Sequence, residues 1–382
     1  MTAYRRVRIL LHPQPLTWLD AYHNPPFQQA LLQVLPTGSS IVVVSPDQQP
    51  NFNLSDWLID DINVVDARLF PESFEAAAQI IWKTSSTIIP LDGRDNTIVT
   101  DGWGGPVRSL LTHPRIPRVI RQAYHSLKDH NLPLYENCLI SNTMHEVTPW
   151  VERPNDLPSP VWPKLEPEHH AKLRSVNLLG WGSHQNAVLK NVHEGPDFHN
   201  RKIIDVTFVG SVAHYPTWAV RRHRSYCIEA IGKLTPEIVR CVGAFMNLPS
   251  SRGHTRYDGV PIAGAIEHTR LLRMSKIAVL PWGFSENSFR DWEANAAGCH
   301  LICPDHGPGV DLVQNPYIYQ KSYTCSPDFS DLPEVVDGIL SAYHYHDNGY
   351  DLLQDHREEF MSRVLDFTYP ARLFLSAIGD LL

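Results

Sequence analysis

The alternation of short, β-branched apolar runs with longer segments of helical periodicity constrains this chain more than any other feature. Such alternation is typical of parallel α/β layers and argues against a β-sandwich. Both halves of the sequence are therefore predicted to be α/β. The predicted strands are Val7–Leu11, Ser40–Ser45, Thr87–Leu91 and Asn96–Thr100 in the first half, and Ile203–Val209, Glu237–Ala244, Lys276–Leu280, His300–Cys303 and Tyr317–Gln320 in the second.

The length of 382 residues exceeds what one ordinary core accommodates and suits two domains of roughly 150 to 200 residues. Proline is concentrated in the stretch from Pro149 to Pro167, where it resists both helix and central strand, so this stretch is predicted to be an irregular crossing. Residues 175–200 fit either half. We place the boundary near residue 200, with a first domain over 1–200 and a second over 201–365.

The C-terminal segment from Asp351 to Leu382 has apolar residues at helical spacing, and Pro370 is expected to break the helix. A final helix over 366–382 that packs back on the first domain fits this pattern. Periodicity alone does not establish that packing.

Composition narrows the classes of partner. Lysine and arginine (33) are outnumbered by aspartate and glutamate (41), so nucleic acid is not an expected partner and any anion site must be local. No run reaches the roughly 18 apolar residues of a membrane span, and the start does not fit a secretory signal. The six cysteines contain no CxxC pair, which indicates reduced, buried thiols. We expect a cytoplasmic protein; peripheral membrane contact stays open.

The most informative segment runs from residue 271 to residue 305 and reads LLRMSKIAVLPWGFSENSFRDWEANAAGCHLICPD. Its apolar run over Lys276–Leu280 predicts a buried strand, and a helix is predicted from about Ser288 to Ala297. Gly298 is expected to end that helix as a left-handed cap before the strand His300–Cys303. The segment is thus one strand–loop–helix–strand unit.

Loops at the carboxyl ends of parallel strands bind ligands, and a helix N-terminus there favours phosphate, so Gly283 to Ser288 is well placed for a pyrophosphate. Arg290 and Glu293 share a helix face at i and i+3. Arg290 would neutralise phosphate while Glu293 accepts hydrogen bonds from ribose hydroxyls. The spacing alone equally fits an ion pair between the two on a solvated helix face.

The run SKIAVLPWG-x-SENSFRDWEANAAGCHLI resembles the donor-binding segment of GT-B glycosyltransferases, in particular the exostosin-like and CgeB-like group. Four further pieces resemble that group. They are DVTFVGS at 205–211, the arginine cluster Arg221, Arg222 and Arg224, DFSDL at 328–332 and LDGRD at 91–95. The resemblance is clearest over about residues 203 to 335.

The resemblance implies a GT-B fold, in which two Rossmann-like domains with parallel sheets face a central cleft. It also implies a nucleotide-sugar donor held by the second domain, a glycan or other hydroxyl acceptor held by the first, and no essential metal or further cofactor. Carried over by position, Glu293 binds the ribose while Ser288 and Arg290 lie on the phosphate side. Glu286 and Glu293 are separated by six residues, whereas retaining members often have seven, so the stereochemistry stays open.

Other residues are weaker candidates. Gly210 and Ser211 follow a predicted strand and permit close approach of a ligand, and Arg222 is our choice among the arginines beyond them; a solvated face is the alternative. Asp92 is a candidate base for the acceptor hydroxyl, although turn chemistry also explains an aspartate there. His12 follows the first strand and is the second catalytic candidate.

The sequence lacks the phosphate-loop signature of ATPases, the glycine fingerprint of dinucleotide-binding proteins and the nucleophile elbow of hydrolases. The leading hypothesis, implied by the resemblance to GT-B enzymes, is a metal-independent glycosyltransferase. A GT-B-like epimerase or phosphorylase acting on a nucleotide sugar, and a non-catalytic sugar-binding or scaffold module, remain as alternatives.

Overall fold

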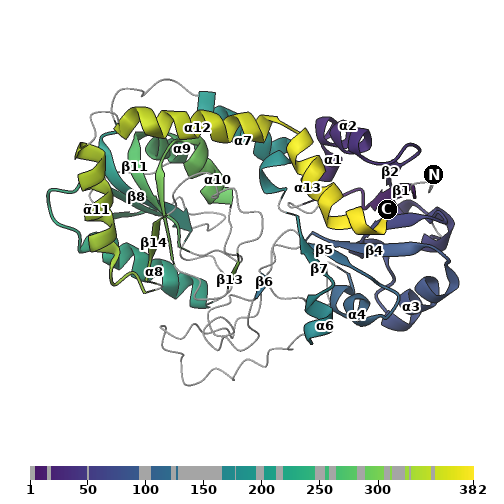
Figure 1. Cartoon of the computed structure of the whole chain (residues 1–382). Helices are drawn as coiled ribbons and strands as arrows, with labels where there is room; N and C mark the ends of the chain where they lie inside the picture. The colour runs from purple at the N-terminus through teal and green to yellow at the C-terminus, as the bar shows by residue number, and fades with distance from the viewer. Residues whose placement is uncertain are drawn as a thin grey trace, which may run out of the picture.

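The computed structural model confirms the α/β class with two mainly parallel sheets, one in each half of the chain (Figure 1). The structure describes residues 5–14, 19–49, 51–93, 105–121, 126–127, 166–176, 178–194, 202–211, 218–245, 254–257, 264–281, 289–304, 310–311, 323–326, 328–345 and 349–382. Within these residues each large sheet has six strands.

The first sheet has the strand order β2-β1-β3-β4-β5-β7, and all its neighbours are parallel. Its strands are β1 (Val7–Leu11), β2 (Ser40–Val43), β3 (Ile62–Asp66), β4 (Thr87–Asp92), β5 (Val119–Arg121) and β7 (Leu173–Ser175). The α-helices of this half are α1 (Asp20–His23), α2 (Pro25–Val34), α3 (Phe74–Lys83), α4 (Val107–Thr112) and α6 (Pro167–His170).

Local sequence explains the longer helices of this half. α2 begins with two prolines, which fit a first helical turn because its N–H groups have no intrahelical partner. α3 begins after Ser73, whose hydroxyl accepts the N–H of Ala76. Each helix then buries one apolar face, as the periodicity requires.

The second sheet has the order β10-β9-β8-β11-β12-β14, with β10 antiparallel at its edge. Its strands are β8 (Ile204–Ser211), β9 (Arg240–Phe245), β10 (His254–Tyr257), β11 (Ser275–Val279), β12 (His300–Pro304) and β14 (Tyr323–Cys325). The helices of this half are α8 (Trp218–Gly232), α9 (Gly264–Met274), α10 (Phe289–Ala296), α11 (Leu332–Tyr345) and α12 (Gly349–Leu365). A small antiparallel pair, β6 (Ser126–Leu127) with β13 (Val310–Asp311), joins a strand from each half.

The predicted strands are confirmed at seven places, with shifts of a few residues at their ends. Asn96–Thr100, Tyr317–Gln320 and nearly all of the proline-rich crossing lie outside the described residues. Sequence reasoning missed the central strand β3, although all five of its residues are buried. The short run of mainly β-branched residues between Asp61 and Asp66 could have indicated this buried strand.

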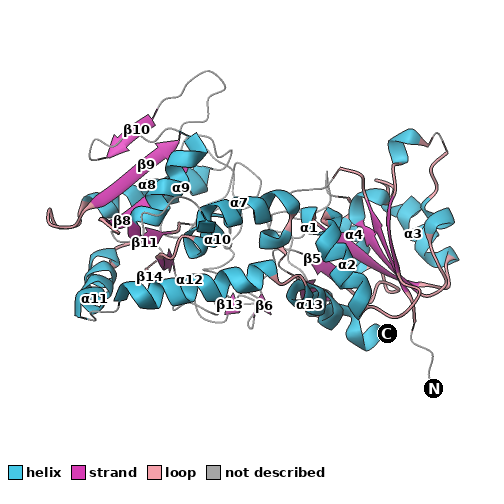
Figure 2. Cartoon of the chain, turned by 90° about the horizontal axis from the view of Figure 1, so that it is seen from above, coloured by secondary structure: helices cyan, strands magenta, loops and turns pink. Residues whose placement is uncertain are grey.

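The C-terminal helices correct one detail. α12 ends at Leu365 and α13 (Thr368–Ile378) begins three residues later, so the break precedes Pro370. Pro370 lies in the first turn of α13, where a missing N–H costs no intrahelical bond. α12 runs along the second half and leads to α13, which packs on α2 of the first (Figures 1 and 2). The ring of Phe374 lies edge-on to Tyr22, with centroids 5.8 Å apart.

One hydrophobic core runs through both halves. Its members include Val7, Ile9 and Val64 of the first sheet as well as Ala278 and Leu301 of the second. Two further cores fill the remaining face of each sheet. The linking elements are a short 3₁₀ turn over Leu179–Trp181 and helix α7 (Ser183–Glu194), which contact α10, α12 and α1. The domain boundary near residue 200 stays a prediction.

Aromatic rings fill the junction between the halves. Trp181 lies edge-on to Trp292 of α10, with centroids 5.1 Å apart, and Trp292 in turn contacts Phe360 of α12. Gly180 approaches the same indole so closely that an added Cβ would lie 2.3 Å from a ring carbon. Only glycine fits there without displacing Trp292.

Cationic side chains hold the carboxyl ends of several helices. Lys202 donates to the carbonyl oxygens of Ser275 (2.7 Å) and Ala297 (3.1 Å), next to the ends of α9 and α10. Arg357 of α12 donates to the carbonyls of Ala296 and His193, at the ends of α10 and α7. Positive charge at a helix C-terminus is favourable because the carbonyls there carry partial negative charge.

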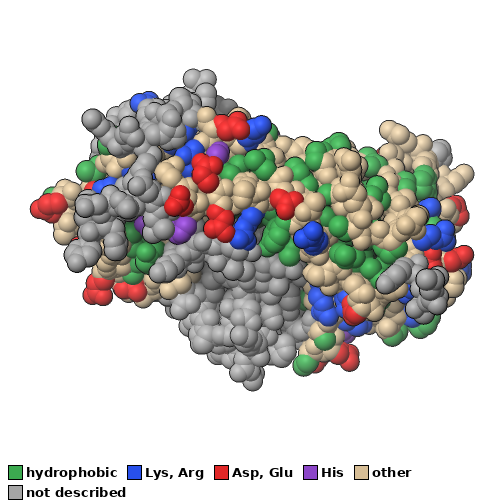
Figure 3. All heavy atoms as spheres, turned by 45° about the horizontal axis from the view of Figure 1, so that its top comes forward, with side chains coloured by type: hydrophobic (Ala, Val, Ile, Leu, Met, Phe, Trp, Pro, Cys, Tyr) green, Lys and Arg blue, Asp and Glu red, His purple; other side chains and the backbone are tan. Residues whose placement is uncertain are grey.

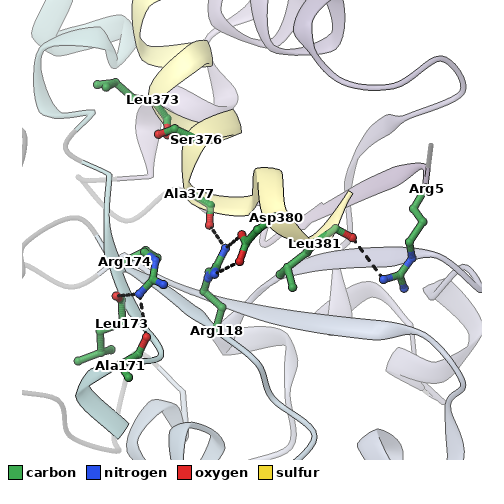
Figure 4. A network of polar contacts seen from close by, with 10 residues as sticks. All are labelled: Arg5, Arg118, Ala171, Leu173, Arg174, Leu373, Ser376, Ala377, Asp380 and Leu381. Carbon is green, nitrogen blue, oxygen red and sulfur yellow. Dashed lines mark hydrogen bonds and ion pairs between the residues drawn. The ribbon is translucent and has the colours of Figure 1, made fainter. Parts of the chain in front are cut away.

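Hydrogen bonds from cationic side chains to backbone carbonyls also hold α13 on the first sheet (Figure 4). Arg118 donates to the carbonyl oxygen of Ala377 and to both carboxylate oxygens of Asp380, at 2.6 and 2.9 Å. Arg5 reaches the carbonyl oxygen of Leu381. The hydrogen bonds from Arg118 lower the pKa of the Asp380 carboxyl. The chain end is therefore anchored to the first half.

Buried charge in the described residues is mostly positive. Six cationic side chains and three carboxylates are buried: Arg118, Arg121, Lys202, Arg224, Arg273 and Arg357, with Asp66, Asp92 and Asp291. On the face drawn in Figure 3, acidic and basic side chains lie interspersed. Four of the five described cysteines are buried, as expected, and Cys303 is half-buried. None of the described helices is both long and apolar enough to cross a membrane.

We predict that Arg118→Ala destabilises the protein more than Asp380→Asn. Loss of the guanidinium leaves the Ala377 carbonyl without this donor and should cost about 1 to 3 kcal/mol. Asp380 is largely exposed, so its removal should cost about 1 kcal/mol or less. Urea unfolding of both variants measures the difference. Equal costs would contradict the anchoring role of the carbonyl contact.

Because folding lowers the pKa of Asp380, its contribution should be present at neutral pH and lost as the pH falls through the folded-state pKa. The gap between wild type and Asp380→Asn should therefore close in acid. If the difference in free energy of unfolding between the two proteins widened in acid, the charge of Asp380 would not be the source of its contribution.

Candidate functional site

The segment from β11 to β12 forms the strand–helix–strand unit that the sequence predicts. β11 and β12 are parallel neighbours in the second sheet, with Ile277 opposite His300. α10 begins at Phe289 and ends at Ala296, close to the predicted bounds. Gly298 has φ of 68°, so the left-handed cap is confirmed. The loop residues Gly283 and Ser288 lie outside the described residues.

Arg290 and Glu293 are not an ion pair on a solvated face. The side chain of Glu293 is 14% exposed, and its Oε1 lies 3.8 Å from Nδ1 of His268. The guanidinium of Arg290 lies instead over the ring of Phe208, 5.7 Å from the centroid. The two side chains therefore share a helix face without neutralising each other through contact.

Burial dominates the electrostatics of this cluster. Burial raises the pKa of Glu293 to about 7, with Arg290 opposing the rise and Asp291 adding to it. Burial and the nearby Arg290 together lower the pKa of His268 to about 3. The imidazole is thus neutral throughout the physiological range, while the carboxyl titrates near neutrality. A ligand group that donates hydrogen bonds would favour the charged carboxylate.

His268 and Phe208 reach this cluster from two other elements. His268 lies in the N-terminal half of α9, and α9 packs on both α10 and β8. Phe208 is a buried residue of β8, two residues before Gly210. Sequence reasoning did not select either residue, because no motif marks them. Only the packing of α9 and β8 around α10 brings them together.

In the arginine cluster of α8, the structure describes the side chain of Arg224 and leaves the predicted role of Arg222 untested. Arg224 is buried, and the charges of Arg224 and Arg290 both act on the thiol of Cys227, whose pKa burial raises. Arg224 therefore lies on the Arg290 side of the core. The side chains of Arg222, our choice from sequence, and of Ser211 at the end of β8 are not described, and for Gly210 the structure describes the backbone strand alone. Their binding role stays a prediction.

In the first half, Asp92 is the last residue of β4 and is fully buried. Its Oδ2 accepts a 2.8 Å hydrogen bond from Nε of Arg121, the last residue of β5, which is also fully buried. The two residues lie opposite each other in the parallel register. A carboxylate and a guanidinium buried together need each other, because either one alone would be an uncompensated buried charge.

His12 follows β1 and is partly exposed. Its Nδ1 accepts the backbone N–H of Gln14 at 3.2 Å, so the neutral ring carries its proton on Nε2. Its own backbone N–H points to Asp66, which is bound by Arg68 through two hydrogen bonds of 3.0 and 2.6 Å. His12 and Asp92 thus lie at the carboxyl edge of the same sheet, at the ends of different strands.

Within the described part of the chain, no group of three or more His, Cys, Asp and Glu side chains is placed to hold a metal ion. The polar groups around α10 suit an organic anion with hydroxyl groups better. They combine a cation and a carboxyl group on α10 with an imidazole on the neighbouring helix α9. Such a set recognises charge and hydrogen-bond donors together.

No protein-family model matches the chain, and no curated protein has a significantly similar sequence. Solved structures with a similar chain course include the glycotransferase of kitacinnamycin, at 12% identity and a TM-score of 0.37 over 98% of this chain and 99% of that one. Another is a UDP-GlcNAc 2-epimerase from Neisseria meningitidis, at 11% identity and 0.41, covering 98% and 100%. A third is OtsA, at 11% identity and 0.48, covering 99% of each chain.

Proposed function

We propose that the chain is a glycosyltransferase that takes sugar from a nucleotide-sugar donor bound by its second half. The acceptor is a hydroxyl group of a glycan or another molecule held by the first half. The observation that carries this proposal is the pair Arg290 and Glu293 at the start of α10. Both residues lie on the helix that follows the parallel strand β11, and their side chains do not form an ion pair with each other. Neither group is therefore neutralised by contact with the other.

Arg290 is the proposed phosphate ligand. It lies in the first turn of α10, where helix N–H groups and the helix dipole also favour an anion. Transfer of the sugar leaves negative charge on the departing diphosphate, and a preorganised guanidinium stabilises that charge in the transition state. We therefore propose metal-independent transfer. Gly283, Ser288, Gly210, Ser211 and Arg222 are the proposed neighbours of the donor.

Glu293 is the proposed ribose ligand. Two neighbouring hydroxyl groups donate well to one carboxylate, and the 14% exposure of the side chain places it at the boundary between core and surface. The similarity of the surrounding sequence to the exostosin-like and CgeB-like transferases supports the same role. We propose in addition that the chain belongs to this exostosin-like and CgeB-like group.

His12 and Asp92 are the proposed acceptor-side residues. His12 is partly exposed, and its Nε2 is the ring nitrogen not engaged by Gln14. Direct proton transfer to Asp92 requires opening of its buried ion pair with Arg121. His12 is therefore the stronger candidate for contact with the acceptor hydroxyl, and Asp92 the weaker one.

The first test is a thermal-shift screen against nucleotide sugars with different bases, followed by transfer assays with hydroxyl acceptors. A nucleotide at 100 times its Kd should stabilise the protein by about 2.7 kcal/mol. Transfer should survive a chelator. Donor turnover without acceptor would favour an epimerase or phosphorylase, and failure of every nucleotide to bind would favour a scaffold. Loss of transfer in EDTA, restored by Mg²⁺ or Mn²⁺, would contradict metal independence.

The second prediction separates the two α10 residues. Glu293→Gln should raise the Kd for a nucleoside diphosphate about 10-fold to 100-fold and abolish discrimination against its 2′,3′-dideoxy analogue. Arg290→Ala should instead weaken the diphosphate relative to the free nucleoside, leaving that discrimination in place. Wild-type affinity should rise with pH through about 7, because ribose hydroxyls bind the charged form of Glu293. The Gln variant should lose this pH dependence; its persistence would assign it to another group.

The third prediction concerns the acceptor side. Asp92→Asn removes the buried carboxylate that pairs with the guanidinium of Arg121 and should lower the free energy of unfolding by about 3 to 5 kcal/mol. His12→Gln should leave stability nearly unchanged while slowing transfer about 100-fold or more. Urea unfolding and initial rates distinguish the two. A stable Asp92→Asn protein without transfer activity would make Asp92 the base instead.

A further inference from the structure

The imidazole of His268 lies close to the carboxyl group of Glu293, which simple packing of the core would not require. Its Nδ1 faces Oε1 of Glu293 at 3.8 Å, and both side chains are 14% exposed. This distance is too long for a hydrogen bond. A small shift of either side chain would bring the two atoms within hydrogen-bonding distance. The imidazole comes from α9, whereas the carboxyl comes from α10.

The placement of α9 brings this contact to the ligand edge of the second sheet. α9 ends at Met274 and β11 begins at the next residue, so the C-terminal end of α9 lies at the amino edge of the sheet. His268 is six residues before that end, which is about 9 Å towards the opposite edge. α10 begins at the same opposite edge, because it follows the carboxyl end of β11. His268 therefore meets α10 near its middle, at Glu293.

Recognition of a ribose by one carboxylate requires a fixed carboxylate. A glutamate side chain has three rotatable bonds, and ordering such a side chain costs conformational entropy. A neighbouring N–H donor that engages one oxygen restricts the carboxylate plane and leaves the second oxygen, together with a lone pair of the first, for ligand hydroxyls. Arg290 cannot do this, because its guanidinium is drawn over the ring of Phe208.

We propose that His268 is a positioning residue for the ribose subsite, which donates through Nδ1 to Glu293 and orients its carboxylate when a nucleotide binds. This inference rests on the proposed function of Glu293 and names the group that supports it. It assigns His268 no contact with the reacting atoms. The predicted consequence is selectivity for an intact ribose diol, beyond the affinity for phosphate.

The experiment measures the ratio of Kd values for UDP, GDP or ADP and the matching 2′,3′-dideoxy nucleotide by calorimetry. Whichever base binds wild type best is used. His268→Leu removes the donor and should lower this ratio about 3-fold to 10-fold. His268→Asn keeps an N–H donor near Nδ1 and should retain most of the ratio. Affinity for the dideoxy nucleotide should change little in either variant.

His300→Leu is the matched control. His300 is also half-buried, and its ring lies 5.7 Å from that of Tyr323. It begins β12 and so lies at the amino edge of the sheet, away from the start of α10. It should alter stability without altering ribose selectivity. A loss of selectivity in His300→Leu equal to that in His268→Leu would overturn the proposal.

A double variant distinguishes positioning from a general structural effect. If His268 acts through Glu293, adding His268→Leu to Glu293→Gln should produce no further loss of ribose selectivity, whereas independent effects would add. Full selectivity in folded His268→Leu, or equal loss in the Asn and Leu variants, overturns the proposal and leaves the ribose role of Glu293 intact. Failure of wild type to bind any nucleotide overturns both.

Discussion

The packing of Trp292 against the turn at Gly180 and Trp181 is the contact on which the rest of the arrangement depends. Trp292 belongs to α10, and the turn belongs to the connection between the two sheets. The approach is so close that no side chain fits at position 180. Phe360 of α12 closes the other side of the indole. One aromatic side chain thereby joins the core of the second half to the connection and to the returning helix.

This contact also determines how the candidate donor site is held. Arg290 and Glu293 lie two positions before and one position after Trp292 on the same short helix. Any rotation of α10 about its axis would therefore pull Trp292 out of the junction. The helix is held at its far end as well, because Lys202 and Arg357 both bind carbonyls of its last turn. A helix fixed at its centre and its end presents its first turn in one orientation.

Sequence patterns predicted the parts of this site that depend on local chemistry. The strand before α10, the extent of the helix and the left-handed Gly298 all follow from apolar runs, capping and glycine preference. The environment of Glu293 does not, because it depends on His268, a residue 25 positions earlier on another helix. The i and i+3 spacing allowed an ion pair with Arg290, and tertiary packing on Phe208 excluded it.

The same distinction explains two further features that the sequence did not predict. Pro370 was expected to break a helix, yet the break falls three residues earlier, and a proline in a first turn is tolerated. The burial of the Arg224 side chain was not predicted either. Three arginines within four positions look alike in a sequence. Whether one of them turns inward depends on the face of α8 that meets the sheet.

The net charge of the chain sets the long-range electrostatic field outside the molecule. The sequence carries a net charge of −8, but among the described residues six cations and only three carboxylates are withdrawn from the surface. Burial moves these charges away from water but does not remove them, so the long-range field stays that of a negatively charged protein. An approaching anion meets long-range repulsion until it comes within reach of a local cation. Added salt screens that repulsion and should speed the encounter, the reverse of electrostatic steering.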